Sequence, residues 1–235
     1  MKKIAYLLAF FVFLHLSFSE VKKEVVKDLL KKYEKALIRV KLVVKTKMSY
    51  SGKETLPNEN KIETKGTFID KNGLVLISLS TIDSSTFFNN KDVHVDVKFS
   101  DIKLILPTGK EIPAKIVLKD KDLDLGFIKP SEKIGEKICY IDLNNYEKVD
   151  IFDDILFLGR TGKYLKRVPF VISSKISAII RKPRTFYITN DGEIGCPAFN
   201  EKGKFVGFFL AIPSLKFMGA ILPSKYILEI KKQIK

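Results

Sequence analysis

The chain has 235 residues, of which 46% are apolar, and this is enough for one substantial buried core. Its formal charge is +15, which would attract nucleic acid, anionic lipid or acidic peptides. The lysines are nevertheless dispersed, and no aromatic residues interleave with an arginine cluster, so we expect a solvated basic surface and no specific nucleic-acid site.

Residues 1–19 have the composition of a secretory signal peptide. Two lysines follow the first methionine, an apolar run extends to Phe18, and Ser17 and Ser19 are small residues that suit cleavage after Ser19. The run is shorter than the ~20 residues of a membrane-spanning helix, although an uncleaved anchor stays open as the alternative. We therefore expect export to the periplasm or beyond, with no membrane span after leader removal and a formal charge lowered by two, to +13.

The next segment, residues 20–36, is predicted to form a short amphipathic helix. Its apolar residues recur at helical spacing between lysines and glutamates. These residues are Val21, Val25, Leu29, Leu30 and Tyr33. From Ile38 onward the chain instead breaks into short β-branched and aromatic runs separated by turn signals, which is typical of an all-β barrel or sandwich. The strands predicted in the first half are 38–45, 66–69, 74–78, 93–99, 102–106 and 112–118.

A second all-β half follows a linker-like stretch at 130–137, which contains a glycine and several charges. We place the boundary there, with the N-terminal helix and first half at 20–134 and the second half at 135–235. A C-terminal helix is predicted at 224–234. The strands predicted in the second half are 139–141, 154–158, 168–180, 185–189, 204–212 and 218–222.

Three segments carry a family resemblance: G-T-F-I-D-K-N-G-L-V-L at 66–76, D-L-D-L-G-F-I-K at 122–129 and G-E-I-G-C-P at 192–197. In this order they resemble G-F-I-I-D-x-x-G-Y-I-L, T-D-L-A-V-L-K and G-N-S-G-G-P of the HtrA (DegP-like) branch of trypsin-fold serine proteases. Weaker matches lie at 106–117, 154–159, 174–179, 203–212 and 219–224. The resemblance implies an all-β fold of two six-stranded Greek-key barrels, with the short N-terminal helix and a C-terminal helix.

The same resemblance assigns the catalytic positions. In this family a hydroxyl attacks, an imidazole takes its proton, a carboxylate orients the imidazole, and backbone N–H groups bind the oxyanion. These roles fall on Ile194, Ser80 and Asp124, with Gly192, Glu193 and Ile194 as the oxyanion loop. Ile194 has no heteroatom, and Ser80 cannot accept a proton near neutral pH. The resemblance therefore implies a pseudoprotease, in which Asp124 is either a remnant of the triad or a residue that caps a turn or pairs with lysine.

A rearranged serine-type or thiol-type endopeptidase stays open as an alternative. Its candidate groups are the thiol of Cys196, His94, and an unaligned serine at Ser84 or Ser85. Cys196 is also a candidate for a disulfide with Cys139, because exported proteins meet an oxidising compartment. The sequence holds no metal-binding spacing, and we expect neither metal nor cofactor.

The segment Phe208, Phe209, Leu210 and Ala211 matches the family strand that follows the nucleophile loop. Family proteases hold extended substrate by strand addition, so this segment is a candidate peptide-binding edge. We expect an extended polypeptide or another exported protein as partner, or a scaffold role, with a basic anion-binding or nucleic-acid-binding protein as a further alternative. No PDZ-like module is expected after the C-terminal helix, and the oligomeric state stays open.

Overall fold

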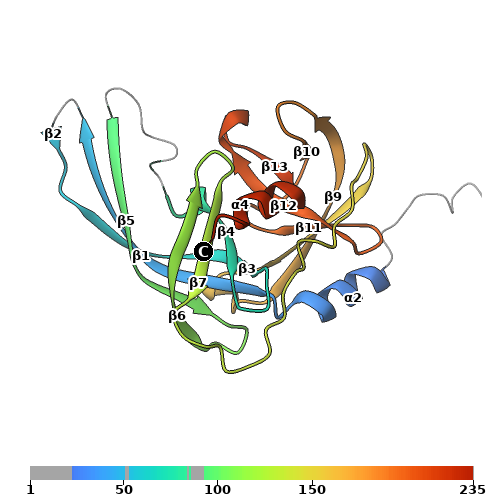
Figure 1. Cartoon of the computed structure of the whole chain (residues 1–235), viewed down its shortest axis with the longest axis horizontal. Coiled ribbons are helices and arrows are strands. Elements are labelled where there is room, and N and C mark those ends of the chain that lie inside the picture. The colour runs from blue at the N-terminus through green and yellow to red at the C-terminus, as the bar shows by residue number, and fades with distance from the viewer. Residues whose placement is uncertain (1–22, 51–52, 84, 86–92, 235) are drawn as a thin grey trace, which may run out of the picture.

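The computed structural model describes residues 23–50, 53–83, 85 and 93–234, and the predicted leader lies outside them. It consists of two β-barrels with one helix near each end of the described chain (Figure 1). The first barrel contains β1 (Leu37–Tyr50), β2 (Lys53–Glu54), β3 (Asn58–Phe68), β4 (Val75–Ser78), β5 (Val93–Ile105), β6 (Glu111–Asp120) and β7 (Leu125–Pro130). The second contains β8 (Asp154–Arg160), β9 (Pro169–Ile180), β10 (Phe186–Thr189), β11 (Pro197–Asn200), β12 (Phe205–Ile212) and β13 (Met218–Pro223). The helices are α2 (Lys23–Tyr33) and α4 (Ser224–Lys231).

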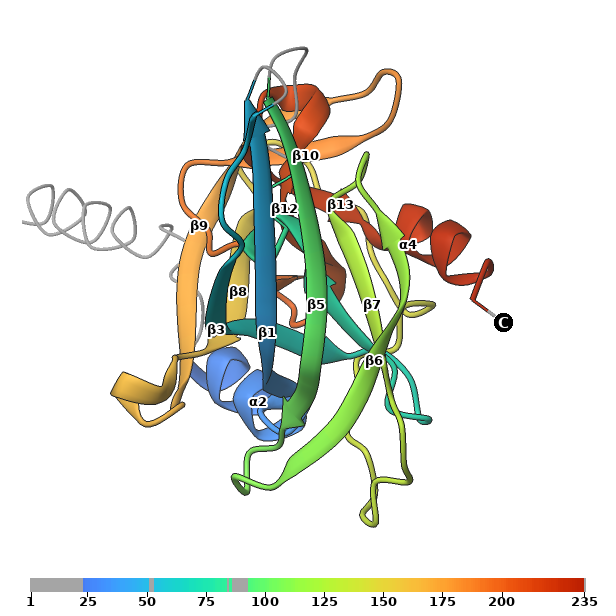
Figure 2. The same ribbon diagram turned by 90° about the vertical axis from the view of Figure 1, so that its left-hand side faces the viewer.

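The first barrel is a closed ring of six antiparallel strands in the order β1-β3-β4-β7-β6-β5, because β5 pairs back onto β1. The two strands predicted at 93–99 and 102–106 form the single strand β5, which continues through a positive φ of 47° at Asp101. Its ladder with β1 reaches Tyr50 and Val93, so the two strands lie side by side along their whole length (Figure 2). Strand β2 pairs only with the outer end of β1.

The second barrel closes in the order β10-β13-β12-β11-β8-β9. Every residue of β8, β11 and β12 is buried, which explains why these segments are almost continuously apolar and not alternating. The predicted all-β fold of two six-stranded barrels with a helix near each end is confirmed. The predicted strand 139–141 is wrong, since this stretch is an irregular connection held by a hydrogen bond of 2.9 Å from Ile141 N–H to the carbonyl of Phe68.

Helix α2 precedes the first barrel in the chain but packs against the second. Leu29 is buried, and the ring of Tyr33 stacks on Phe199 of β11 with 5.1 Å between the ring centroids. The prediction grouped this helix with the first barrel at 20–134, whereas its contacts lie on the second. The predicted boundary after residue 134 falls in the connection between β7 and β8.

One apolar cluster runs through both barrels. It joins Leu76 and Phe127 of the first barrel to Phe199, Phe208 and Leu222 of the second. Each such side chain stabilises the fold by about 1.5–3 kcal/mol when it is buried. The two barrels are therefore held face to face, and the candidate site lies at their junction.

A buried arginine network crosses the same junction. Arg39 of β1 donates to the carbonyl of Arg160 in β8 over 3.1 Å, and Arg160 donates back to the carbonyl of Leu37 over 2.6 Å. Glu63 of β3 accepts from Arg39 at 3.0 Å and from Arg167 of the second barrel at 2.7 Å. These charge-assisted bonds fix the angle between the barrels.

The pKa directions of this network follow from burial and pairing. Burial lowers the pKa of Arg39 and that of Arg160. Burial also tends to raise the pKa of Glu63, but its hydrogen bonds and ion pairs with Arg167 and Arg39 outweigh this and hold that pKa below its usual value. Glu63 is therefore a carboxylate at neutral pH.

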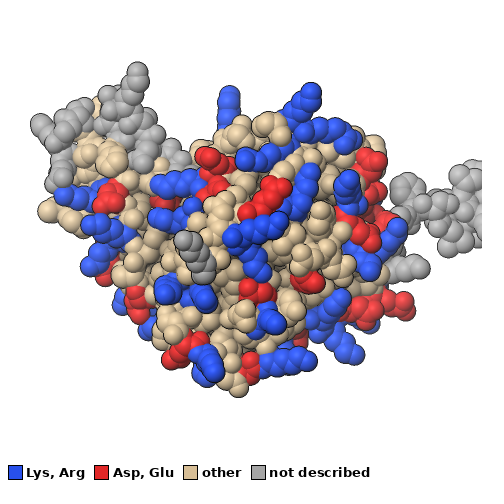
Figure 3. All heavy atoms as spheres, in the orientation of Figure 1, with Lys and Arg blue, Asp and Glu red and all other residues tan. Residues whose placement is uncertain are grey.

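The surface charge is mixed. On the face drawn in Figure 3, lysines and arginines are interspersed with aspartates and glutamates over both barrels. This agrees with the dispersed charge of the sequence. Among the described residues, no helix combines the length and the apolar character needed to cross a bilayer.

Candidate functional site

Asp124 lies at the centre of the barrel junction and is fully buried. It sits in the tight turn before β7 with a positive φ of 59°, a conformation that aspartate tolerates better than most residues. Its carboxylate accepts hydrogen bonds from Ser80 N–H of the first barrel at 2.6 Å and from Ala211 N–H of the second at 3.0 Å. The carboxylate thus links the two barrels directly.

The hydroxyl groups beside Asp124 complete its surroundings. Ser78 Oγ donates to the Asp124 carboxylate and lies 3.0 Å from Ser80 Oγ. Burial raises the pKa of Asp124, and the hydrogen bonds from Ser78, Ser80 and Ala211 offset part of this effect. Where the family has an imidazole on the carboxylate, this chain has two serine hydroxyls.

The loop that carries the nucleophile position closes on the same point from the second barrel. Gly195 has a φ of 86°, and a methyl group built on it would lie 3.9 Å from Cβ of Ser78. Its N–H donates to the carbonyl of Phe209 over 2.7 Å. Next to it, the half-buried side chain of Ile194 packs against the core of the second barrel. Ser80, Asp124 and the loop around Ile194 therefore converge on one junction, as the resemblance implies.

The space beside this loop is filled by the ring of Phe209, which is 6% exposed. A methyl group built at Gly192 would lie 2.8 Å from that ring, and one built at Gly219 of β13 would overlap it. On its inner side the ring packs edge-on against Phe157 with 5.1 Å between the ring centroids. The two glycines make room for the ring, so no side-chain pocket opens between this loop and β13.

An ion pair crosses the junction next to the loop. Lys65 Nζ of β3 lies 2.6 Å from Glu193 Oε1, and the lysine side chain is 19% exposed. Glu193 is one of the predicted oxyanion-loop residues, and here its carboxylate ties the loop to the first barrel. The bond holds the two sides of the junction together where an extended peptide would have to enter.

The predicted peptide-binding edge is not free. Residues Phe208 to Ala211 belong to β12, which is buried between β11 and β13. The backbone of Phe209 bonds to Gly195 N–H and to the carbonyl of Cys196, while Ala211 N–H bonds to Asp124. These three backbone groups are therefore used within the protein, and peptide binding at the segment stays a prediction.

The two cysteines are free thiols, so the candidate disulfide does not form. Cys139 lies in the connection between the barrels with its Sγ 3.1 Å from the carbonyl of Lys32. Cys196 is buried inside the second barrel, and burial raises its pKa to about 12. A thiol in this environment stays protonated and does not act as a nucleophile.

The other candidate catalytic groups do not join the site. His94 is exposed and pairs with Ser49 near the outer end of the β1–β5 ladder. Ser85 is buried, where its hydroxyl bonds to the carboxylate of Asp83 and accepts from Lys121 Nζ at 2.9 Å. Ser84 lies outside the described residues. Within the described part of the chain, no three His, Cys, Asp or Glu side chains are grouped so that they could hold a metal ion.

Comparison with known proteins agrees with this geometry. No protein-family model matches the chain. It is 31% identical over 125 residues, or 51% of its length, to a protein of Rhizobium meliloti (strain 1021) named "Probable periplasmic serine endoprotease DegP-like". Together with the two barrels, this partial match supports a relationship to trypsin-like, DegP-like proteases. The aligned part of the chain spans only 24% of the relative's length.

Sequence reasoning missed two contributors to the site, Ser78 and Lys65, and gave a third, Phe209, another role. Ser78 replaces the imidazole as a partner of Asp124, Phe209 fills the space beside the loop, and Lys65 holds Glu193. Ser78 precedes the predicted base position, Ser80, by two residues, and this short distance in the sequence was the only signal that it could contact Asp124. The other two depend on which strands face each other across the junction, which no local pattern contains.

Proposed function

We propose that this chain is an exported HtrA-like pseudoprotease, which cleaves no peptide and serves as a scaffold or binds a partner through a surface outside the junction. One observation supports this proposal more strongly than the others. The position that supplies the nucleophile in the family holds Ile194, whose side chain packs on the core of the second barrel. An alkyl group cannot form an acyl-enzyme.

The surroundings of Asp124 support the same proposal. An orienting carboxylate needs an imidazole to orient, but this one is occupied by Ser78 Oγ and by the N–H groups of Ser80 and Ala211. Its role here is to join the barrels. This structural role explains why an aspartate stands at position 124 even if the protein catalyses no reaction.

The alternative of a serine-type or thiol-type endopeptidase with a rearranged site is disfavoured by the surroundings of its candidate nucleophiles. Cys196 is buried with its pKa raised to about 12, and Ser85 is buried with its hydroxyl already bonded to Asp83 and Lys121. Among the described residues, neither has an imidazole beside it, since His94 lies on the β1–β5 ladder. Neither group therefore has the imidazole that serves as general base in the family mechanism.

The filled junction favours a partner surface elsewhere. A trypsin-like protease places the side chain before the scissile bond in a pocket near its nucleophile. In this chain Phe209 fills the space beside the loop, and β12 has no free edge at Phe208 to Ala211. Export is supported by the leader-like residues 1–19 and by the word periplasmic in the name of the R. meliloti relative.

Activity labelling tests the proposal directly. The purified chain is incubated with a fluorophosphonate probe, an iodoacetamide probe and a casein substrate, with trypsin as the positive control. We expect no casein cleavage and no labelling that depends on the native fold. Casein cleavage, or labelling that disappears after heat denaturation, would refute the pseudoprotease. Loss of such a signal in Ser85→Ala or in Cys196→Ala would then identify the nucleophile.

A further inference from the structure

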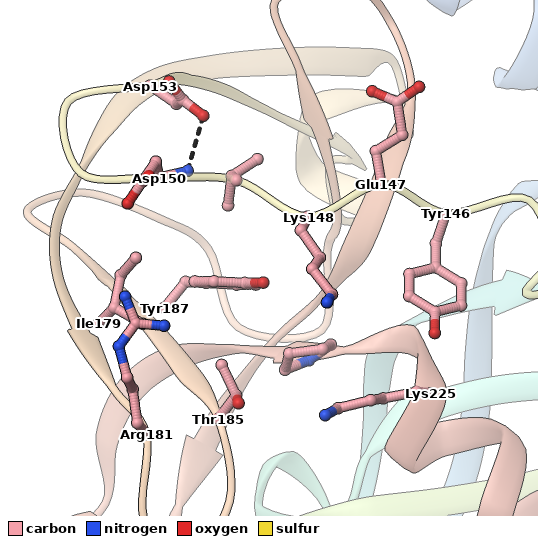
Figure 4. Close-up of a pocket in the computed structure, with 12 residues that line it drawn as sticks. Tyr146, Glu147, Lys148, Asp150, Asp153, Ile179, Arg181, Thr185, Tyr187 and Lys225 are labelled. Atoms are coloured by element: carbon pink, nitrogen blue, oxygen red, sulfur yellow. Dashed lines mark hydrogen bonds between the residues drawn. The ribbon is translucent and has the colours of Figure 1, made fainter.

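A concave pocket of about 390 Å³ lies on the second barrel, away from the triad-equivalent positions. Its walls are the segment 146–153, the end of β9, the start of β10, and the point where β13 leads into α4 (Figure 4). Val149, Ile179 and Pro223 supply its apolar surface. Its volume falls within the roughly 300–1,000 Å³ of small-molecule sites.

Three cationic side chains converge on this pocket. The ammonium groups of Lys148 and Lys225 point toward the same space from opposite walls, and the guanidinium of Arg181 stands beside Tyr187 (Figure 4). Within the described part of the chain, none of the three has a carboxylate within ion-pair distance. Lys225 Nζ lies 4.5 Å from the ring of its neighbour Tyr226, which is a neutral partner. Three cations that face one space without an ion-pair partner among the described residues form an arrangement that suits an anion.

The carboxylates that line the pocket are committed to the protein. Glu147 accepts a hydrogen bond from Asn200 Nδ2 at 3.0 Å and points away from the pocket centre in Figure 4. Asp153 accepts from Asp150 N–H at 2.7 Å, and Asp150 accepts from Ile151 N–H at 3.0 Å. These bonds shape the loop that holds Lys148. The three carboxylates balance the formal charge of the three cations in the lining, so anion binding depends on the ammonium groups that point into the pocket while Glu147 points away.

Hydroxyl groups add neutral donors to the same space. Tyr187 is 5% exposed and its hydroxyl points toward the centre of the pocket, which Thr185 also lines (Figure 4). Thr185 is held in place because its N–H donates to the Tyr226 hydroxyl over 2.9 Å. A ligand with several oxygens could therefore be bound by charge and by directed hydrogen bonds at once.

We propose that this pocket binds the phosphate group of a small molecule through Lys148, Arg181 and Lys225. Three cations suit a dianionic phosphate better than a single carboxylate, and guanidinium geometry favours bidentate binding of phosphate oxygens. The concave shape and the apolar wall favour a small ligand over a nucleic acid, and the lysines and arginines are dispersed along the sequence. The site is independent of the proposed loss of protease activity.

Calorimetric titration at low ionic strength tests the site with three probes: inorganic phosphate, phenyl phosphate and benzoate. We expect both phosphates to bind and benzoate to bind at least about tenfold more weakly, since a lost charge-assisted bond is worth about that factor. Tighter binding of phenyl phosphate than of inorganic phosphate identifies a phosphate ester as the ligand class, and equal binding identifies free phosphate. Lys148→Met, Arg181→Met and Lys225→Met should each weaken phosphate about tenfold.

Lys98→Met is the matched control, because it removes the same charge from β5, where the side chain is 79% exposed. Circular dichroism checks that each variant is folded. The proposal is overturned if the wild-type chain binds neither phosphate, or if Lys98→Met weakens binding as much as the pocket variants. It is also overturned if a single-stranded oligonucleotide binds more tightly than phenyl phosphate and the pocket variants leave this unchanged.

Discussion

At the scale of single residues, Asp124 is the buried carboxylate that joins the two barrels. Its sequence context assigned it to the triad, and the structure places it where the triad would be. Its partners there are Ser78 and the N–H groups of Ser80 and Ala211, which come from both barrels. The carboxylate is needed because it accepts all three bonds in a buried place, where unpaired N–H groups are costly.

Asp124→Asn is therefore expected to destabilise the fold by about 1–3 kcal/mol. Asparagine tolerates the positive φ, but its amide nitrogen donates and cannot accept from Ser80 or Ala211. Urea unfolding at neutral pH measures the difference. Asp122→Asn, an exposed aspartate in the same turn, serves as control and should change stability by less than about 0.5 kcal/mol. Equal stability of Asp124→Asn and the wild-type chain would contradict the bridging role.

At the scale of elements, the close approach of β12 and β13 decides the packing of the second barrel. Gly207 of β12 pairs opposite Pro223, and a methyl group on it would overlap the backbone carbonyl of Leu222. The neighbouring Phe209 is accommodated because Gly219 stands opposite its ring. Glycine at these two positions follows from the distance between strands, and not from turn geometry.

Gly207→Ala is expected to destabilise the protein by about 1–3 kcal/mol or more, because backbone atoms cannot move aside as a side chain does. Gly135→Ala, in the open connection between the barrels, has no atom within 4 Å of the new methyl group and should be neutral or slightly stabilising. The measurement is the thermal unfolding temperature of each variant relative to that of the wild-type chain. If both melt at the wild-type temperature, the strands are less tightly packed than described.

At the scale of the whole molecule, the barrels are joined by an apolar cluster and by the arginine network around Glu63. Charge-assisted bonds from Arg39 and Arg167 hold the pKa of Glu63 below its usual value. A lowered pKa in the folded state stabilises the protein above the unfolded-state pKa, and this contribution is lost as the pH falls through the folded-state value. The stability that Glu63 contributes is thus acid-sensitive.

Glu63→Gln should cost about 1.5–3 kcal/mol at pH 7, and the difference from wild type should shrink as the pH falls below the usual glutamate value of 4.5. Chemical unfolding of both proteins across this pH range measures the difference. Glu59→Gln provides the contrast, because its ion pair with Lys45 is about half exposed and worth at most about 1 kcal/mol. A constant Glu63→Gln penalty from pH 7 to pH 3 would show that Glu63 acts by shape alone.

Much of the fold could be predicted from the sequence, and so could the candidate triad-equivalent positions. The contacts that the side chains at these positions make could not be predicted. The segments around Asp124 and Ile194 carry a local order of residues that fixes their register. The sequence could not place the segment Phe208 to Ala211 inside the sheet, because an apolar strand looks alike at the edge and in the middle of a sheet. The disulfide between Cys139 and Cys196 failed for a related reason, since spacing along the chain does not fix distance across a barrel.

The sequence by itself determined the all-β class and the resemblance to a two-barrel fold, and it led to the prediction that Ser80 and Ile194 stand at the base and nucleophile positions, because these depend on residue identity and short-range pattern. Tertiary structure alone decided that Asp124 joins the barrels and that Phe209 fills the junction. It also decided that Lys148, Arg181 and Lys225 share a pocket, since three segments far apart in the chain meet there. Such contacts form only when strand order brings distant residues together, which is why no local pattern predicts them.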